Sequence, residues 1–186
     1  MLVIPELGES NDEKGYAFET AVLGVSSRLT RKRVREHYKH GAEFMAVVSV
    51  VKDIQNKLGD WNPKEPRTEP ARILFDEVSS HLKLEKHNLR LYISVGTQLD
   101  YDYGADFFFA LKRGNVEAIV TVDLTVSKRK EEHKAEIVIT VEDLRDESRR
   151  SQLVEIISRR LEKKLEKISK KKKRRNSNFV PKYLQR

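Results

Sequence analysis

Two β-rich runs separated by a short turn constrain this chain more than any other part of its sequence. Residues 105–112 and 116–127 are rich in aromatic and β-branched residues, which favour strands. Between them lies Arg113-Gly114-Asn115, and Gly-Asn is a favoured two-residue hairpin turn. We therefore predict an antiparallel hairpin in the register that places Arg113 opposite Val116.

One face of this predicted hairpin is wholly apolar. Its cross-strand pairs are Leu111 with Ala118, Phe109 with Val120, Phe107 with Val122, and Ala105 with Leu124. A slip of one residue would move this set to the other face, so the pattern itself supports the register and requires the face to be buried. Near the turn, Lys112 would face Glu117 as an ion pair.

The other face of the hairpin places two carboxylates opposite each other, Asp106 and Asp123. Like charges in that arrangement destabilise a sheet, and Asp is a poor strand residue. One interpretation is a functional site, in which a divalent cation with hard oxygen ligands neutralises the pair. The other is that this end of the hairpin is exposed and both aspartates are hydrated. A turn one residue longer would also remove the opposition.

The periodicity of the remaining chain predicts an α/β (α+β) fold, with a central antiparallel-to-mixed sheet of about four strands flanked by helices. Besides the hairpin, strands are expected over 89–95 and 135–141, and residues 59–70 are expected to form a loop. Helices are predicted over residues 12–29, 31–58, 71–84 and about 146–170. We expect one domain over 1–168 with a helical insertion at 31–84, followed by a basic, disordered tail over 169–186.

The charge of the chain favours polyanionic partners. Lysine and arginine number 37 against 29 acidic residues, which gives a formal net charge of +8. Neutralising phosphates releases counterions, so nucleic acid, DNA or RNA, is the expected partner. The candidate phosphate-binding residues are Arg31, Lys32 and Arg35 in one basic block and Lys171, Lys172, Lys173, Arg174 and Arg175 in another. A solvated helix face explains the first block equally well, and a nuclear-import signal or solubility tail is the alternative for the second.

Other features restrict the class of protein. Without cysteine the chain has no disulfide and no thiolate zinc site. Its first residues lack a signal-peptide pattern, and its longest apolar run, 46–48, is too short to span a bilayer. We expect an intracellular protein, cytoplasmic or nuclear, with no membrane partner. The long amphipathic helices over 31–58 and 146–170 also make a homo-oligomer possible.

Three segments of the sequence resemble the PD-(D/E)XK superfamily, the restriction-endonuclease-like nucleases. Residues 15–22, GYAFETAV, are similar to the first helix of that family, with Glu19 as its acidic residue. Residues 104–108, GADFF, resemble its second-strand motif, and residues 122–125, VDLT, resemble its third-strand motif. Together these segments and their surroundings cover about a third of the chain.

This resemblance implies a metal-dependent nuclease. Asp106 and Asp123 would be ligands of Mg²⁺ or Mn²⁺, Glu19 would complete the shell or orient water, and Thr125 would contact water or phosphate. Thr125 stands where the family usually has lysine, and strand 135–141 follows the third strand where the family usually has a helix. The missing lysine favours the alternative of a non-catalytic nucleic-acid-binding or assembly protein that retains the fold, and the different topology makes the chain a divergent member.

Overall fold

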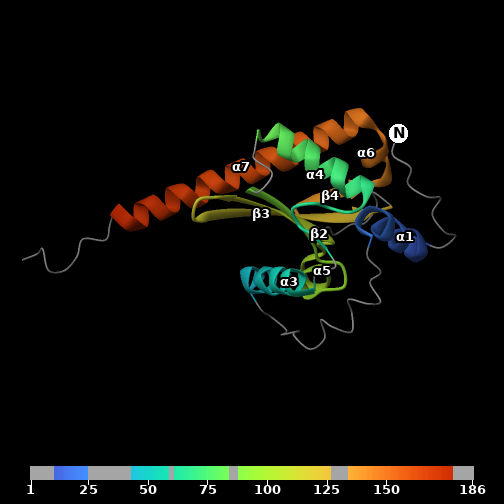
Figure 1. The fold of residues 1–186 in the computed structure, drawn as a ribbon, viewed down its shortest axis with the longest axis horizontal. Helices are drawn as coiled ribbons and strands as arrows, with labels where there is room; N and C mark the ends of the chain where they lie inside the picture. Colours follow the sequence, from blue (N-terminus) through green and yellow to red (C-terminus); the bar gives the residue numbers. More distant parts are fainter. Residues whose placement is uncertain (1–10, 25–42, 59–60, 84–87, 127–133, 178–186) are drawn as a thin grey trace, which may run out of the picture.

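A four-stranded mixed sheet with helices on both faces forms the centre of the chain (Figure 1). The structure is a computed structural model, and it describes residues 11–24, 43–58, 61–83, 88–126 and 134–177. The strands lie in the order β1-β2-β3-β4, with bounds β1 (Leu89–Ile93), β2 (Phe107–Arg113), β3 (Val116–Thr125) and β4 (Ile137–Thr140). This arrangement is an α+β fold and confirms the predicted class.

Strands β2 and β3 form the predicted hairpin. Arg113 pairs with Val116, and the same register continues to Phe107 opposite Val122. Gly114 has a φ of 57°, in the left-handed region that a tight hairpin turn requires and that glycine adopts without strain. The register was predictable because it is the one that gathers the apolar residues on a single face.

The predicted hairpin is wrong at the end away from its turn. The ladder stops at Phe107 and Val122, so the predicted pairs Ala105 with Leu124 and Asp106 with Asp123 lie beyond it. Near the turn, Glu117 forms an ion pair with Lys52 on a helix across the sheet, in addition to its ladder position opposite Lys112. That tertiary partner could not be read from the hairpin alone.

Strand β4 pairs in parallel with β3, which makes the sheet mixed. Val122 lies opposite Ile137 and Thr125 opposite Thr140. Parallel neighbours need a crossover connection rather than a hairpin. Residues 127–133 of this connection lie outside the described residues. The predicted strand 135–141 is shorter in the structure, because Val141 already begins a helix.

The helices are α1 (Asn11–Leu23), α3 (Phe44–Leu58), α4 (Glu69–His81), α5 (Gln98–Tyr103), α6 (Val141–Arg145) and α7 (Glu147–Ser177). The helix predicted over 12–29 ends at Leu23, because Gly24 adopts a φ of 69°, and the helix predicted over 31–58 begins only at Phe44. Residues 25–42 lie outside the described residues. The helix predicted from 71 begins at Glu69, with Pro70 in its first turn, where proline is tolerated. In these ranges no helix is long and apolar enough to cross a membrane.

The basic C-terminal segment differs from its prediction. We expected a disordered tail from residue 169, yet α7 continues to Ser177 (Figure 1). Lysine and arginine are good helix formers, and a helix already anchored on a protein core needs no new nucleation to extend. Residues 178–186 lie outside the described residues.

Both faces of the sheet are buried. On one face, α1, α4, α6 and α7 pack against Phe107, Phe109 and their neighbours in the larger core cluster. On the other face, α3 and α5 cover Phe108 and Ala110 in a smaller cluster. Figure 1 shows α4 and α7 above the sheet and α3 and α5 below it. Most apolar residues of α3 and α7 are therefore covered within one chain, while Met45, Ile156 and Ile168 stay exposed, and an oligomer through these helices stays a prediction.

Side chains cap the outer edge of β1. The Gln55 side chain on α3 donates to the carbonyl of Ile93 and accepts from its amide at 3.1 Å. Trp61 Nε1 donates to the carbonyl of Leu91 at 2.8 Å, and the Leu91 amide donates to the carbonyl of Pro63 at 2.8 Å. These contacts satisfy backbone groups that would otherwise remain open to another strand.

Replacing Gln55 should therefore weaken the fold. In Gln55→Ala both backbone groups of Ile93 lose their side-chain partner, and we expect the free energy of unfolding to fall by about 1–3 kcal/mol. Urea denaturation followed by circular dichroism measures this change. Asn56→Ala, at an exposed position of the same helix, is the control and should change stability by less than ~0.5 kcal/mol. Equal effects of the two substitutions would contradict the edge-capping role.

Candidate functional site

The connection from β1 to β2 positions Asp106. Its backbone carbonyl accepts hydrogen bonds from the amides of Ser94, at 2.7 Å, and Val95, at 3.0 Å. The Ser94 hydroxyl donates to the carbonyl of Ala105 at 2.6 Å. Helix α5 lies inside this connection and ends at Gly104, whose φ of 58° reverses the chain. The two ends of the connection are thus joined immediately before β2 begins.

Where the ladder between β2 and β3 ends, the Asp106 carboxylate takes the place of a backbone carbonyl as hydrogen-bond acceptor for β3. The backbone amide of Asp106 donates to the carbonyl of Val122 at 2.9 Å, which is outside the hairpin register. The amide of Leu124 then donates to Oδ2 of Asp106 at 2.6 Å. Ala105 consequently packs in the smaller cluster with Phe108, instead of with Phe107 as predicted. Asp106 is only 4% exposed, so the interpretation of a hydrated carboxylate is wrong for this residue.

Negative charges surround Asp106. Burial raises its pKa well above the usual value, and the nearby carboxylate of Glu19 raises it further. The hydrogen bond from the Leu124 amide acts in the opposite direction, while Asp100 and Asp123 add smaller upward contributions. The fold thus brings together the three acidic residues singled out in the sequence, from α1, the start of β2, and β3.

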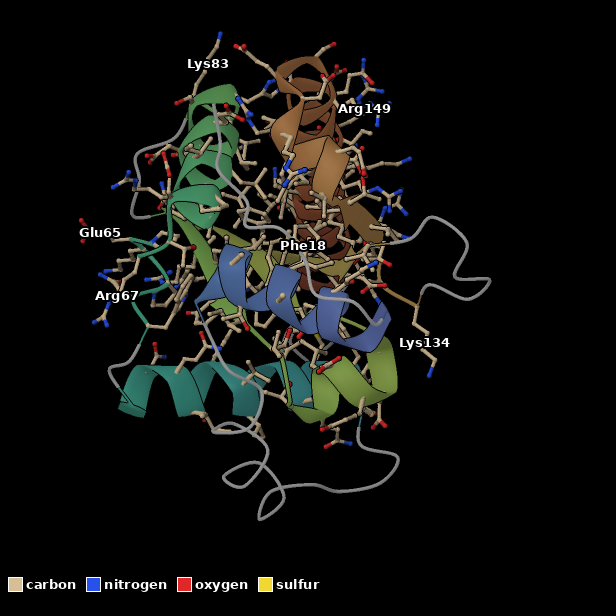
Figure 2. The ribbon with its side chains drawn as sticks, turned by 90° about the vertical axis from the view of Figure 1, so that its right-hand side faces the viewer. Phe18, Glu65, Arg67, Lys83, Lys134 and Arg149 are labelled. Carbon is tan, nitrogen blue, oxygen red and sulfur yellow. The ribbon has the colours of Figure 1, made fainter. Side chains whose placement is uncertain are left out.

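Helix α1 carries Glu19 to this position. Phe18, which Figure 2 labels on α1, is buried in the larger cluster together with Val22 and Leu23 of the same helix. Glu19 follows Phe18 directly and is half-buried. The docking of the apolar face of α1 therefore determines where this carboxylate lies.

Asp100 was missed in the sequence analysis. It lies on α5, where its Oδ2 accepts a hydrogen bond from the amide of Gly96 at 2.7 Å. The side chain of Thr97 caps the same helix by accepting from the amide of Leu99. In the sequence Asp100 alternates with tyrosines and another aspartate, and nothing distinguishes it from Asp102. Only the folding of the β1–β2 connection brings it near Asp106.

Asp123 and Thr125 are buried residues on β3, 7% exposed each. They lie opposite Val138 and Thr140 in the parallel ladder with β4. Thr140 also begins α6, where its side chain and that of Asp143 form a capping box. Thr125 therefore lies where β3, β4 and α6 meet, on the same strand as Asp123 and two residues beyond it.

The carboxylate oxygens of this site suit a hard cation, but their positions in the described residues do not form a metal site. Glu19, Asp106 and Asp123 offer the carboxylate oxygens that Mg²⁺ and Mn²⁺ prefer. Among the residues that the structure describes, however, no three histidine or acidic side chains converge closely enough to hold a metal ion. The chemistry of the side chains therefore fits such an ion, and their positions would have to draw closer around it.

The candidate phosphate-binding residues are only partly described. Arg31, Lys32 and Arg35 lie outside the described residues. Lys171, Lys172, Lys173 and Arg174 are exposed on α7, and Arg175 belongs to the same helix. Lys172 Nζ lies 3.4 Å from the carbonyl of Asn115, which places this part of α7 beside the hairpin turn. These cations are therefore at the opposite end of the sheet from Asp106.

Comparisons with models of protein families, with curated proteins and with solved structures found no match to this chain.

The raised pKa of Asp106 predicts a pH dependence of stability. The folded protein holds this proton over a pH range in which the unfolded chain has released it. The stabilisation that protonated Asp106 gives the folded state is therefore fully present below the unfolded-state pKa of this residue. It is lost as pH rises through the raised folded-state pKa. At neutral pH in a chelator, Asp106→Asn should increase the free energy of unfolding, because the neutral amide avoids the cost of ionising a buried carboxyl group.

Urea denaturation at several pH values tests this expectation. The wild type should lose stability relative to Asp106→Asn as pH rises from acidic to neutral. Asp53→Asn, which removes an exposed carboxylate on α3, should leave that profile unchanged. If Asp106→Asn destabilises the protein at neutral pH without metal, the buried carboxylate stabilises the fold in its charged form.

Proposed function

We propose that this protein is a divalent-metal-dependent nuclease that hydrolyses phosphodiester bonds in DNA or RNA. The observation that carries the proposal is the buried carboxylate of Asp106 with Glu19, Asp100 and Asp123 around it, which raises its pKa. A fold that only required stability would avoid this arrangement. Mg²⁺ or Mn²⁺ would offset the mutual repulsion and let these carboxylates remain ionised together.

Each residue has a distinct part in this proposal. Asp106 and Asp123 hold the cation, while Glu19 completes the ligand set or orients the attacking water. Thr125 contacts the water or a phosphate oxygen. When bound, the cation supplies Lewis acidity toward a phosphoryl oxygen and lowers the pKa of water. In the hydrolysis, the water oxygen bonds to phosphorus, the bond from phosphorus to the leaving alcohol oxygen breaks, and that oxygen receives a proton.

Two further features agree with this function. The positions of Glu19, Asp106 and Asp123 are those that resemble the motifs of PD-(D/E)XK nucleases, and the mixed four-stranded sheet brings them to one end. The net charge of +8 and the exposed cations of α7 suit a polyanionic substrate.

A non-catalytic nucleic-acid-binding or assembly protein is the second candidate. Two observations favour it: Thr125 stands where the related nucleases usually have lysine, and no three acidic or histidine side chains of the described segments are arranged to hold a metal. In this case the buried aspartates would be an inherited feature without catalytic use. The two candidates share nucleic acid as partner and differ in dependence on metal.

Cleavage assays separate the candidates. Purified protein is incubated with end-labelled single- and double-stranded DNA and RNA in Mg²⁺, Mn²⁺ or EDTA. We expect metal-dependent cleavage that falls at least about a hundredfold in Asp106→Asn and Asp123→Asn, because even residues that only support a metal ligand cost 10–100-fold. Asp53→Asn is the control of equal charge and should cleave like the wild type. Binding without cleavage under all conditions would favour the second candidate.

Metal binding can be measured without substrate. A divalent cation that binds the folded state and not the unfolded chain raises the melting temperature by mass action. We expect Mn²⁺ and Mg²⁺ to stabilise the wild type and Asp53→Asn in differential scanning fluorimetry, and to have much less effect on Asp106→Asn. Equal shifts in all three proteins would place any bound cation elsewhere.

A further inference from the structure

One sector of α7 carries a row of cations, which begins with Arg149 and is dense from Arg159 to Arg174. At 100° per residue, its members lie within about 120° of one another around the helix. We call this row the cation stripe, and it consists of Arg149, Arg159, Arg160, Lys163, Lys167, Lys170, Lys171 and Arg174, all of them exposed. Figure 2 shows Arg149 at the outer surface where α7 begins. Gln152 and Ile156 lie among these cations as uncharged residues of the same sector, and the buried Leu153 lies at its edge.

The rest of α7 explains why the stripe is exposed. Leu153, Ile157 and Leu161 are buried in the larger core cluster and attach the side of the helix next to the stripe to the sheet. Three of the four acidic residues of α7 lie on one flank, where Glu155 pairs with Arg159, Glu166 with Lys170, and Glu162 with Arg113 of the hairpin. The centre of the stripe therefore carries no negative charge, and its cations face solvent.

We propose that the cation stripe binds the phosphate backbone of double-stranded nucleic acid. The inference rests on the proposed function and names the form of its substrate. A duplex presents one phosphate charge for about every 1.7 Å of its axis, the densest row of negative charge that a nucleic acid offers. The stripe from Arg149 to Arg174 is about 38 Å long at 1.5 Å per residue, which corresponds to about eleven base pairs.

The chemistry of α7 favours a duplex over a single strand. Proteins that bind single strands stack bases on aromatic side chains, and the sequence from Glu147 to Ser177 contains no aromatic residue. The stripe can therefore contact phosphates and has nothing to hold exposed bases. An anionic membrane surface is also a poor fit. A helix that lies in a membrane needs a free apolar face, and that face of α7 is buried in the core.

The stripe leads from the hairpin turn to the carboxylates. The C-terminal part of α7, which carries the end of the stripe, lies beside Asn115 through Lys172 on another side of the helix and continues past the sheet (Figure 1). The first residues of the stripe follow α6, which begins directly after Thr140, the ladder partner of Thr125. A duplex bound along α7 would thus extend toward the end of the sheet that carries Asp106 and Asp123. Short oligonucleotides should reach only part of the stripe.

Binding in EDTA tests the inference separately from cleavage. Fluorescence anisotropy is measured for a 24-base-pair duplex, an 8-base-pair duplex and the matching single strands, in DNA and in RNA, at several salt concentrations. The stripe variant is Lys163→Gln/Lys167→Gln/Lys171→Gln. Its matched control, Lys64→Gln/Arg67→Gln/Arg72→Gln, removes the same charge at exposed positions of the α4 region. Figure 2 shows Arg67 on another side of the molecule from Arg149.

We expect the long duplex to bind more tightly than the short duplex and than either single strand. The slope of log affinity against log salt should decrease by about three in the stripe variant, one for each lost phosphate contact, and by much less in the control. Glutamine keeps the helix propensity of lysine, so circular dichroism should be unchanged.

Several results would overturn the inference. One is an equal loss of duplex affinity in the stripe variant and in the control. Another is that single strands bind as tightly as the duplex. The third is that the protein binds phosphatidylserine vesicles and does not bind duplexes. Duplex binding that depends on the stripe, together with no cleavage in Mg²⁺ or Mn²⁺, would support the stripe and contradict the nuclease.

Discussion

Strands β2 and β3 have apolar residues on both faces, and the arrangement of the helices follows from the need to bury them. The successive aromatics Phe107, Phe108 and Phe109 alternate between the two core clusters, and all three are at most 1% exposed. Burying such side chains contributes about 1.5–3 kcal/mol each, which is large beside the net stability of a domain. Helices must therefore cover both sides of the sheet: α4 and α7 on one, α3 and α5 on the other.

The same constraint creates the candidate site. Once helices cover both faces, a polar side chain at the end of the hairpin is enclosed as well. Asp106 satisfies one oxygen with the amide of Leu124, and its neighbours Glu19 and Asp100 keep its pKa high. In water these carboxylates would repel each other weakly, whereas inside the protein the repulsion and the desolvation are both costly. That cost is the physical basis for proposing a cation as their partner.

The hairpin and two of the site's aspartates could be predicted from the sequence, because they follow from patterns of neighbouring residues. The hairpin register follows from period-two alternation and a Gly-Asn turn, and the special status of Asp106 and Asp123 follows from carboxylates within apolar strands. Asp100 could not be found, since its place near Asp106 depends on how the β1–β2 connection folds back. The helical state of 169–177 was also missed, because consecutive cations repel each other in isolation and become helical when an anchored helix extends into them.

The sequence by itself determined the α+β class, the antiparallel hairpin, the excess of positive charge, and Asp106 together with two of the carboxylates near it, Glu19 and Asp123. These features depend on neighbours along the chain or on composition. Tertiary structure decided that β4 runs parallel to β3, that Glu117 pairs with Lys52, and that Asp106 ends the ladder through its side chain. These outcomes depend on contacts between residues far apart in the chain, whose free energies no local pattern contains.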